Sequence, residues 1–228
     1  MTSVILWLSK IKELSLSLIF NLSPAGLVQE EYDLIVDKLL QGCLIIYPTE
    51  TFYGLGGVAS SVTVAQKIFE LKGRESGKPL PFVASDLDMV LRLVEEPSPL
   101  FFRLVEHFWP GSLTVVLRAK DKALPETILG PNGTIAVRIP PLDWLRQIIK
   151  KIDCLLISTS ANFSGQPPLS SFQEVLEIFK GKVDVIINGG ETPGEKPSTI
   201  IDLTSPEPVC LREGKIPLSE IWKVLVDE

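Results

Sequence analysis

The sequence predicts one α/β domain built on a twisted, open mixed sheet that is flanked by helices. Short apolar runs alternate with segments whose apolar residues recur at helical spacing, and the two kinds of segment mix along the whole chain. The chain has 228 residues, 45% of them hydrophobic and 22% charged, which is enough apolar material for one sizeable core. We see no internal repeat or low-complexity linker that would divide it.

The segment 1–27 is interpreted as an N-terminal extension of a main domain that covers residues 28–228. Four apolar residues at spacings of four, three and four predict an amphipathic helix there: Trp7, Ile11, Leu14 and Leu18. Charged residues interrupt the apolar run before it reaches the roughly 20 residues that span a bilayer. A secretory signal is the less favoured interpretation, because the first residues carry no basic side chain.

Helices and strands then follow one another closely. A helix over residues 30–41 is predicted because apolar side chains recur on one side and Gly42 follows as a stop. The apolar run 43–47 is typical of a buried strand. A second helix is expected over 62–71 and a strand over 80–84.

Two more helices precede the middle of the chain. Ser85 is expected to cap a helix over residues 87–94, with Asp86 and Asp88 at the positive end of its dipole. A helix over residues 100–108 should end at the Trp-Pro-Gly sequence that follows it.

The second half of the chain continues the same alternation. Ser171, with Glu174 three residues later, predicts a capping box for a helix that runs to Lys180. The other helices are expected over 142–150 and 218–226, and the strands over 113–117, 134–139, 154–158, 183–187, 199–203 and 209–212.

The composition excludes several classes of function. A net charge of −6 and a pI near 5.0 argue against a protein that coats nucleic acid, although a local basic groove is compatible with them. The single histidine, His107, leaves too little for a histidine-ligated zinc site or a Ser-His-Asp triad. Cys43, Cys154 and Cys210 lie among apolar residues, which favours buried thiols in a reducing compartment such as the cytoplasm.

Polar residues gather where several predicted strands end. The first buried strand runs into YPTETFYGLG, and the strand at 154–158 runs into STSAN. Arg138 lies among apolar residues in AVRIP, and Arg212 ends a strand in LREG. Ligands of open α/β sheets bind beyond strand ends, so these edges predict an anion pocket made of hydroxyl and guanidinium groups.

Each of these features also has a plainer interpretation. The Lys72-Gly-Arg74 sequence, with Lys78 after it, suits a phosphate, but interleaved glutamates favour a solvated charged loop on that evidence alone. Arg138 must pair or line a cavity if it is buried, and it faces solvent if its strand lies at an edge. The glycines of YGLGG match neither a dinucleotide fingerprint nor a Walker A motif.

As an ordered set the motifs are more specific than they are singly. YPTETFYGLG, KGR, WPGSLTVVL, TIAVRIP, STSANFSGQPP, PSTIID and LREG together resemble the YrdC-like family, in its short single-domain form. The resemblance runs from about Val28 to beyond Arg212 and implies a twisted open sheet around a concave basic cavity. It also implies synthesis of threonylcarbamoyl-AMP and pyrophosphate from L-threonine, bicarbonate and ATP, with Mg²⁺ accompanying the ATP.

The resemblance further implies the site residues and the partners. ATP would be held by Lys72, Arg74, Lys78, Thr134, Ser160, Asn162 and Arg212, among which Lys72, Arg74, Ser160 and Asn162 form the Lys-x-Arg and Ser-x-Asn signature. Threonine would be held by Thr51, Arg138, Ser158 and Ser198, and Glu50 is assigned less firmly as a residue that holds a cation in place. The product would pass to the threonylcarbamoyl transferase complex that modifies adenosine 37 of tRNA. No membrane is expected, and direct tRNA binding stays open.

The sequence departs from the family pattern at three places. Glu75 replaces the proline that often follows the signature arginine, LREG replaces Leu-Arg-Pro-Gly, and the region around Val83 is apolar where some members have a histidine. The main alternative is a paralogue that binds nucleotide or RNA without making the adenylate. A pure RNA-binding module and a carbamoyl-transfer module are further alternatives.

Overall fold

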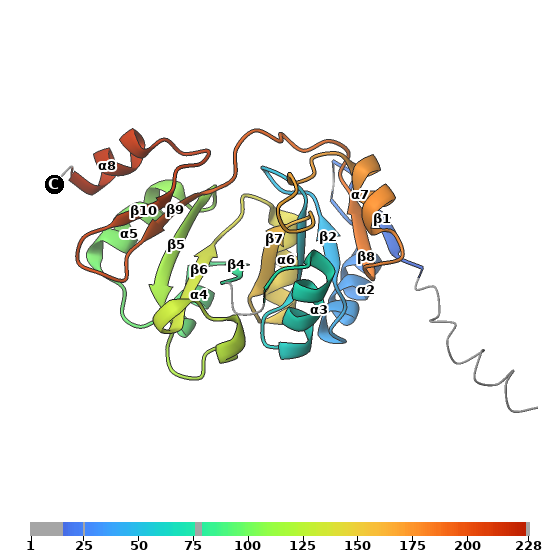
Figure 1. The fold of residues 1–228 in the computed structure, drawn as a ribbon, viewed down its shortest axis with the longest axis horizontal. Helices are drawn as coiled ribbons and strands as arrows, with labels where there is room; N and C mark the ends of the chain where they lie inside the picture. Colours follow the sequence, from blue (N-terminus) through green and yellow to red (C-terminus); the bar gives the residue numbers. More distant parts are fainter. Residues whose placement is uncertain (1–15, 25, 76–78, 227–228) are drawn as a thin grey trace, which may run out of the picture.

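The computed structural model describes residues 16–24, 26–75 and 79–226, and all its strands within these ranges join one mixed sheet. The strands lie in the order β1-β8-β2-β3-β7-β4-β6-β5-β9-β10 (Figure 1). Their bounds are Leu18–Asn21 (β1), Ile45–Tyr47 (β2), Gly54–Val58 (β3), Pro81–Val83 (β4), Leu113–Arg118 (β5), Thr134–Arg138 (β6), Leu156–Ser160 (β7), Val185–Asn188 (β8), Thr199–Asp202 (β9) and Val209–Arg212 (β10). The α/β prediction with a twisted mixed sheet is confirmed.

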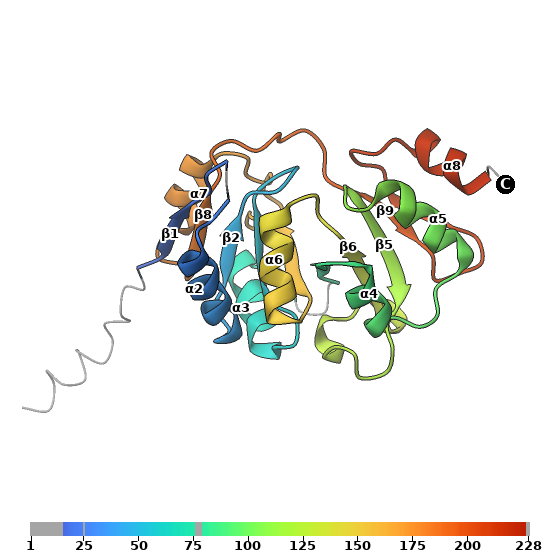
Figure 2. The same cartoon turned by 180° about the vertical axis from the view of Figure 1, so that it is seen from behind.

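Helices cover the two faces of the sheet unequally. Figures 1 and 2 show α2, α4 and α6 over one face, while α3 lies on the other face against β3. The helices are Gln29–Leu40 (α2), Val62–Lys72 (α3), Leu87–Leu93 (α4), Pro99–Phe108 (α5), Asp143–Ile152 (α6), Phe172–Phe179 (α7) and Leu218–Val226 (α8). The face of β5, β6 and β9 opposite α4 is therefore left to be lined by side chains and loops.

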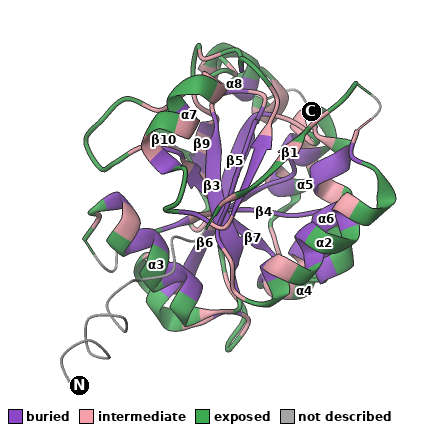
Figure 3. Cartoon of the chain, turned by 90° about the vertical axis from the view of Figure 1, so that its right-hand side faces the viewer, coloured by how far each residue is buried: buried purple, intermediate pink, exposed green. Residues whose placement is uncertain are grey.

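The buried side chains form one core between the sheet and its helices. In Figure 3 the strands are largely buried, and the helices that surround them are exposed on their outer sides. Strand β5 shows the principle, because Leu113, Val115 and Leu117 are buried apolar residues at every second position. The residues between them point to the opposite face, where the site is found.

A long connection carries the chain from one side of the sheet to the other. β8 is second in the strand order and β9 is ninth, and the segment 189–198 between them arches along one end of the sheet (Figure 1). The backbone N–H of Gly194 donates to the carbonyl of Thr51 at 2.8 Å, which fastens the arch to the loop between β2 and β3. This path delivers Ser198 to the open face.

The prediction for the N-terminal extension is wrong at Leu18. This residue begins β1, which pairs in parallel with β8, so residues 18–21 belong to the sheet of the main domain. The domain therefore starts before residue 28. Ser17 supports the pairing, because its hydroxyl donates to the carbonyl of Val183 at 2.6 Å. The helical prediction for Trp7, Ile11 and Leu14 lies outside the described residues.

The glycine-rich stretch after the PTET sequence is a strand, which the sequence analysis missed. β3 is fully buried between β2 and β7, and α3 lies against it. A Cβ atom on Gly56 would collide with the carbonyl oxygen of Ile157, and one on Gly57 would lie 2.6 Å from Val64 Cγ1. Glycine is disfavoured in most strands, but here only glycine lets the neighbouring backbones approach.

Two smaller expectations also changed. Asp86, and not Ser85, caps α4, because its carboxylate accepts the N–H of Met89 at 2.9 Å. The strand predicted at 154–158 is β7 at 156–160, so that Ser160 lies inside the sheet. Ser171 caps α7 by accepting the N–H of Gln173, which confirms the serine half of the predicted capping box with Glu174. Among the described residues no helix is both long enough and apolar enough to cross a membrane.

Candidate active site

A cavity of about 930 Å³ opens over the face of the sheet that α4 leaves free. Alternate residues of neighbouring strands line it, which follows from the two-residue period of a strand. The contributions are Thr114, Val116 and Arg118 from β5, Thr134, Ala136 and Arg138 from β6, Ser158 and Ser160 from β7, and Ile200 and Asp202 from β9. The predicted polar residues thus meet through alternation along strands, and not only at strand ends.

Arg138 is the buried cation at the centre of this cavity. It is 9% exposed, and its guanidinium forms an ion pair and hydrogen bond with Glu50 Oε1. The same carboxylate oxygen accepts the hydroxyl of Ser112 at 3.2 Å, while Oε2 of Glu50 is buried without a hydrogen-bond partner among the described residues. The less firm assignment of Glu50 as the residue that holds a pocket cation is confirmed in its geometry.

Arg212 brings a second guanidinium to the same side of the cavity. Its Nε and Nη2 donate to the carbonyl of Ser198 at 3.1 and 2.9 Å. The hydroxyl of Ser198 in turn lies 2.8 Å from that of Thr114. Burial lowers the pKa of Arg212, and the nearby charge of Arg138 lowers that pKa further. Two guanidiniums that repel each other in a cavity make a favourable place for an anion.

Hydroxyl groups surround these two cations. The buried phenol of Tyr47 donates to Ser158 Oγ at 2.7 Å, and burial raises the pKa of Tyr47 to about 12. The hydroxyls of Thr49 and Thr51 lie 3.0 Å apart, and Thr49 also donates to the carbonyl of Phe52. These groups offer neutral donors and acceptors in fixed positions.

The Lys-x-Arg and Ser-x-Asn residues lie together at the end of β7. Arg74 lines the cavity, and its Nη2 donates to the carbonyl of Pro79 at 2.8 Å. Its Nε is buried without a hydrogen-bond partner among the described residues, and burial lowers the pKa of Arg74. Lys72 is 3% exposed, and its ammonium donates to Ser160 and Asn162 instead of facing the cavity.

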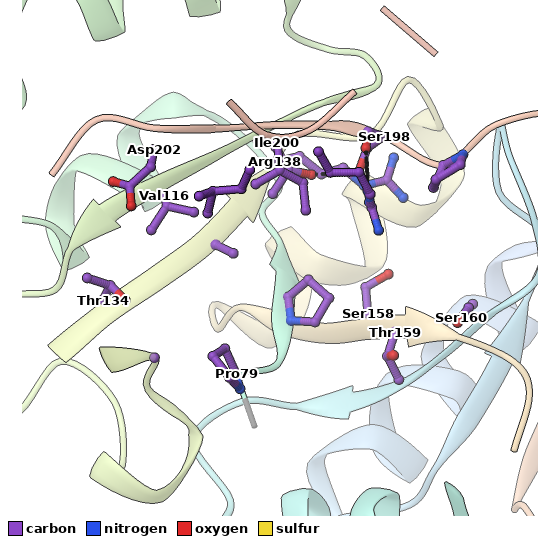
Figure 4. Close-up of a pocket in the computed structure, with 18 of the residues that line it drawn as sticks. Pro79, Val116, Thr134, Arg138, Ser158, Thr159, Ser160, Ser198, Ile200 and Asp202 are labelled. Atoms are coloured by element: carbon purple, nitrogen blue, oxygen red, sulfur yellow. Dashed lines mark hydrogen bonds between the residues drawn. The ribbon is translucent and has the colours of Figure 1, made fainter. Parts of the chain in front are cut away.

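The far side of the cavity is more apolar. Figure 4 shows Val116, Thr134 and Asp202 across the cavity from Ser158, Thr159 and Ser160. Val116 lies on β5, and the apolar side chains of Ala136 and Ile200 come from the two strands beside it, β6 and β9. The cavity therefore combines one end rich in cations and hydroxyls with an opposite side to which Val116, Ala136 and Ile200 contribute apolar groups.

Eight of the eleven predicted ligand residues line this one cavity: Thr51, Arg74, Thr134, Arg138, Ser158, Ser160, Ser198 and Arg212. Lys72 and Asn162 lie directly behind it, and Lys78 lies outside the described residues. Thr49, which the sequence assigned less firmly, also lines the cavity, and the sequence analysis missed Thr114 and Asp202. Thr114 had a readable signal, because it is the one polar residue inside the otherwise apolar strand LTVVL.

Within the described residues no three His, Cys, Asp or Glu side chains come together in a way that could hold a metal ion. The three cysteines are free thiols. The guanidinium and hydroxyl groups that line the cavity can position an anionic ligand.

The sequence model of the Sua5/YciO/YrdC family, described as telomere recombination, matches residues 37–214. This chain belongs to that family. The match spans the loop after β2, the signature residues and Arg212, so it covers every described residue that was predicted to hold a ligand.

One curated relative is the threonylcarbamoyl-AMP synthase of Pyrococcus abyssi. It is 40% identical over 185 residues, which are 81% of this chain and 54% of that protein. The chain spans about half the length of the curated relatives it matches.

Solved structures agree with the fold. The structure of Pyrococcus abyssi Sua5 complexed with L-threonine superposes with a TM-score of 0.86 at 36% identity, over 92% of this chain and 61% of that chain. Escherichia coli YciO superposes with a TM-score of 0.81 at 27% identity, over 90% of this chain and 99% of that chain.

Proposed function

We propose that this protein makes threonylcarbamoyl-AMP and pyrophosphate from L-threonine, bicarbonate and ATP. The observation that carries the proposal is the cavity in which Arg138 and Arg212 converge with the hydroxyls of Ser158 and Ser198. Such a cavity suits a substrate carboxylate and a polyphosphate together. Kinship with a family that includes synthases of this product supports the choice of substrates.

The amino acid binds at the end of the cavity that holds Arg138. The guanidinium carries five donors and Glu50 engages only one edge of it, so donors remain for the carboxylate of threonine. Ser158 and Ser198 flank this position, and Thr51 offers a hydroxyl to the substrate's polar groups. A neighbouring synthase crystallised with L-threonine supports this ligand.

ATP occupies the rest of the cavity. The adenine ring lies against the apolar wall near Val116 and Ile200, where Thr134 offers a hydroxyl. The phosphates lie toward Arg74, Ser160 and Arg212, which line the cavity. Mg²⁺ would be held mainly by the ATP phosphates, with Asp202 as a carboxylate that lines the cavity, and would supply charge neutralisation there.

The reaction transfers the AMP group to a carbamate. Bicarbonate dissociates into carbon dioxide and hydroxide, and the unprotonated amine of threonine adds to the carbon of carbon dioxide. The proton that the amine then releases combines with the hydroxide to form water. A carbamate oxygen then attacks the α-phosphorus while the bond to pyrophosphate breaks. Negative charge that spreads over the phosphoryl oxygens is stabilised by fixed cations, so neither a covalent nucleophile nor the lone histidine is needed.

The product is an activated carbamate that serves the threonylcarbamoyl modification of adenosine 37 in tRNA. A transferase complex receives it, in the reducing cytoplasm to which three free thiols are suited. The acidic pI near 5.0 favours handing the product to a partner over broad binding of tRNA by this chain.

The decisive experiment measures pyrophosphate release from ATP and Mg²⁺, with L-threonine and bicarbonate added separately and together. We expect release only when both are present. Release without threonine would indicate an ordinary ATP hydrolase, and release without bicarbonate would indicate an aminoacyl adenylate.

The second candidate is a member of the same fold that binds nucleotide without making the adenylate. Escherichia coli YciO superposes over 90% of this chain with a TM-score of 0.81, so the fold alone does not decide between the two candidates. ATP binding in the cavity with no pyrophosphate release under any combination of substrates would make this the conclusion.

A further inference from the structure

The two cations of the Lys-x-Arg pair face opposite ways. Arg74 lines the cavity, and its Nε has no hydrogen-bond partner among the described residues, whereas Lys72 is 3% exposed and is not among the cavity's lining residues. Only Gly73 separates them in the sequence, yet their surroundings differ. Lys72 is therefore not placed to bind a phosphate in the way that Arg74 is.

The ammonium of Lys72 is fully occupied. It donates to the backbone carbonyl of Ser160, to the carbonyl of Asn162 at 2.8 Å and to Oδ1 of Asn162 at 2.9 Å. An ammonium has three donors and no acceptor. It would have to break one of these bonds to reach a phosphate, and the abandoned carbonyl would then be left without its partner in a buried place.

The backbone of Lys72 holds the same loop from a second side. Its carbonyl at the C-terminus of α3 accepts the N–H of Ser164 at 2.7 Å. Within the loop the hydroxyl of Ser160 donates to Asn162 Oδ1 at 2.6 Å, and Asn162 Nδ2 donates to the carbonyl of Gln166. Lys72 thus joins α3 to a loop that is already hydrogen-bonded within itself.

We propose that Lys72 is a positioning residue that fixes Ser160 and the loop 160–166 against α3, while Arg74 alone of the pair contacts the substrate phosphates. The inference rests on the proposed function, because it assigns separate roles within that site. Burial, and then the charge of Arg74, lower the pKa of Lys72 to about 8, which agrees with an ammonium that is enclosed by neutral oxygens.

The first test compares Lys72→Met with Arg74→Met, which removes the neighbouring charge as a matched control. In Lys72→Met we expect amide hydrogen exchange at residues 160–166 to become at least about tenfold faster, and kcat for pyrophosphate release to fall about 30-fold with KM for ATP within about threefold. In Arg74→Met we expect unchanged exchange in the loop and a KM for ATP raised about tenfold. The melting temperature of both variants is measured to show that they fold.

The proposal fails if Lys72→Met leaves exchange at 160–166 unchanged and raises KM for ATP as Arg74→Met does. Lys72→Arg sharpens the result, since it keeps the charge but cannot reproduce three short bonds in a closed space. We expect no rescue of kcat by arginine, and rescue to wild-type rates would contradict a positioning role.

A second measurement needs no variant. In a crystal structure of the wild-type chain with a non-hydrolysable ATP analogue, we expect Nζ of Lys72 to keep its three protein partners, with Arg74 on a phosphate oxygen. A Nζ atom within hydrogen-bond distance of a phosphate oxygen would overturn the inference. Failure of the wild-type protein to bind ATP or release pyrophosphate would instead count against the proposed function, so the two failures are distinguishable.

Discussion

Two buried cations of this molecule, Arg138 and Lys72, differ in what surrounds them. Arg138 pairs with the carboxylate of Glu50 and still lines the cavity, whereas Lys72 donates only to neutral oxygens behind it. A guanidinium has donors to spare after one such contact, but an ammonium with three acceptors has none. The comparison teaches that burial of a charged group does not by itself identify it as a ligand-binding group. A buried cation can bind a ligand only if it has N–H donors that the protein does not already use.

Replacing Arg138 by alanine should have the largest effect. We expect kcat/KM for threonine to fall at least about 100-fold, because the substrate carboxylate loses its charged partner and Glu50 is left buried without one. Stability should fall by about 3 kcal/mol for the second reason. Initial rates against threonine and against ATP, with urea unfolding alongside, measure both effects. Equal losses for the two substrates would mean that the amino acid binds elsewhere.

The pKa of Lys72 predicts the next largest effect, on the alkaline side of the pH profile. Above a pKa of about 8 the amine keeps only two donors for three oxygens, so kcat should fall by up to about tenfold for each further pH unit. The neighbouring Arg74 does not contribute to this fall, because its guanidinium stays protonated over the same pH range. A wild-type profile that is flat from pH 7 to pH 9.5 would contradict this.

Lys72 should affect stability in the opposite direction, because its contribution to the free energy of unfolding should rise with pH while kcat falls. The pKa of Lys72 in the folded chain lies below its ordinary value of 10.5, so between about pH 8 and 10.5 the unfolded chain binds a proton that the folded chain has released. Its contribution to the free energy of unfolding is therefore smallest below pH 8 and rises with pH through that window. The difference between wild type and Lys72→Met, measured by urea unfolding at pH 7 and pH 10, isolates it.

Replacing Glu50 by glutamine tests the other partner of the comparison. The amide still accepts from Arg138, but the guanidinium is no longer neutralised, and its aim at the substrate is held less firmly. We expect KM for threonine to rise about tenfold and KM for ATP to stay within about twofold. Glu207→Gln, on an exposed loop, is the matched control and should leave both constants unchanged. A larger rise in KM for ATP than in KM for threonine would show that Glu50 acts on the ATP subsite and not on the threonine subsite.

Replacing Tyr47 by phenylalanine should have the smallest effect. The phenol donates one hydrogen bond to Ser158 Oγ, so its loss costs about 1 kcal/mol of stability and raises KM for threonine less than about threefold. Thermal unfolding and initial rates measure the two quantities. A loss of activity comparable with that of Arg138→Ala would show that the phenol touches the substrate directly.

Much of the site was predictable, because hydroxyls and arginines inside apolar patterns stand out. Arg138 was recognised this way, whereas Ser160 was assigned from the Ser-x-Asn signature, and both line the cavity. The role of Lys72 was not readable, since a sequence gives no direction for a side chain at the end of a helix. Only the packing of the loop against α3 decides that Lys72 turns inward while Arg74 turns to the cavity.

The fold was predictable wherever periodicity was strong and failed where tertiary contacts override local preference. The buried face of α2 and the apolar run of β2 were correctly placed. β3 was missed because glycine is disfavoured in strands. Its glycines are required because β7 and α3 approach too closely to leave room for a Cβ atom. β1 was misread as helical because Leu18 continued an apolar spacing, whereas its pairing with β8 comes from residues far along the chain.

The most direct test of the account is to follow carbon from labelled bicarbonate in the presence of ATP, Mg²⁺ and L-threonine. The account predicts that the label appears in a compound with the mass of threonylcarbamoyl-AMP, in proportion to the pyrophosphate released, and that Arg138→Ala abolishes both signals. Pyrophosphate release without label in a nucleotide conjugate, or no release while ATP binds, would contradict the account and leave nucleotide binding as the function of this cavity.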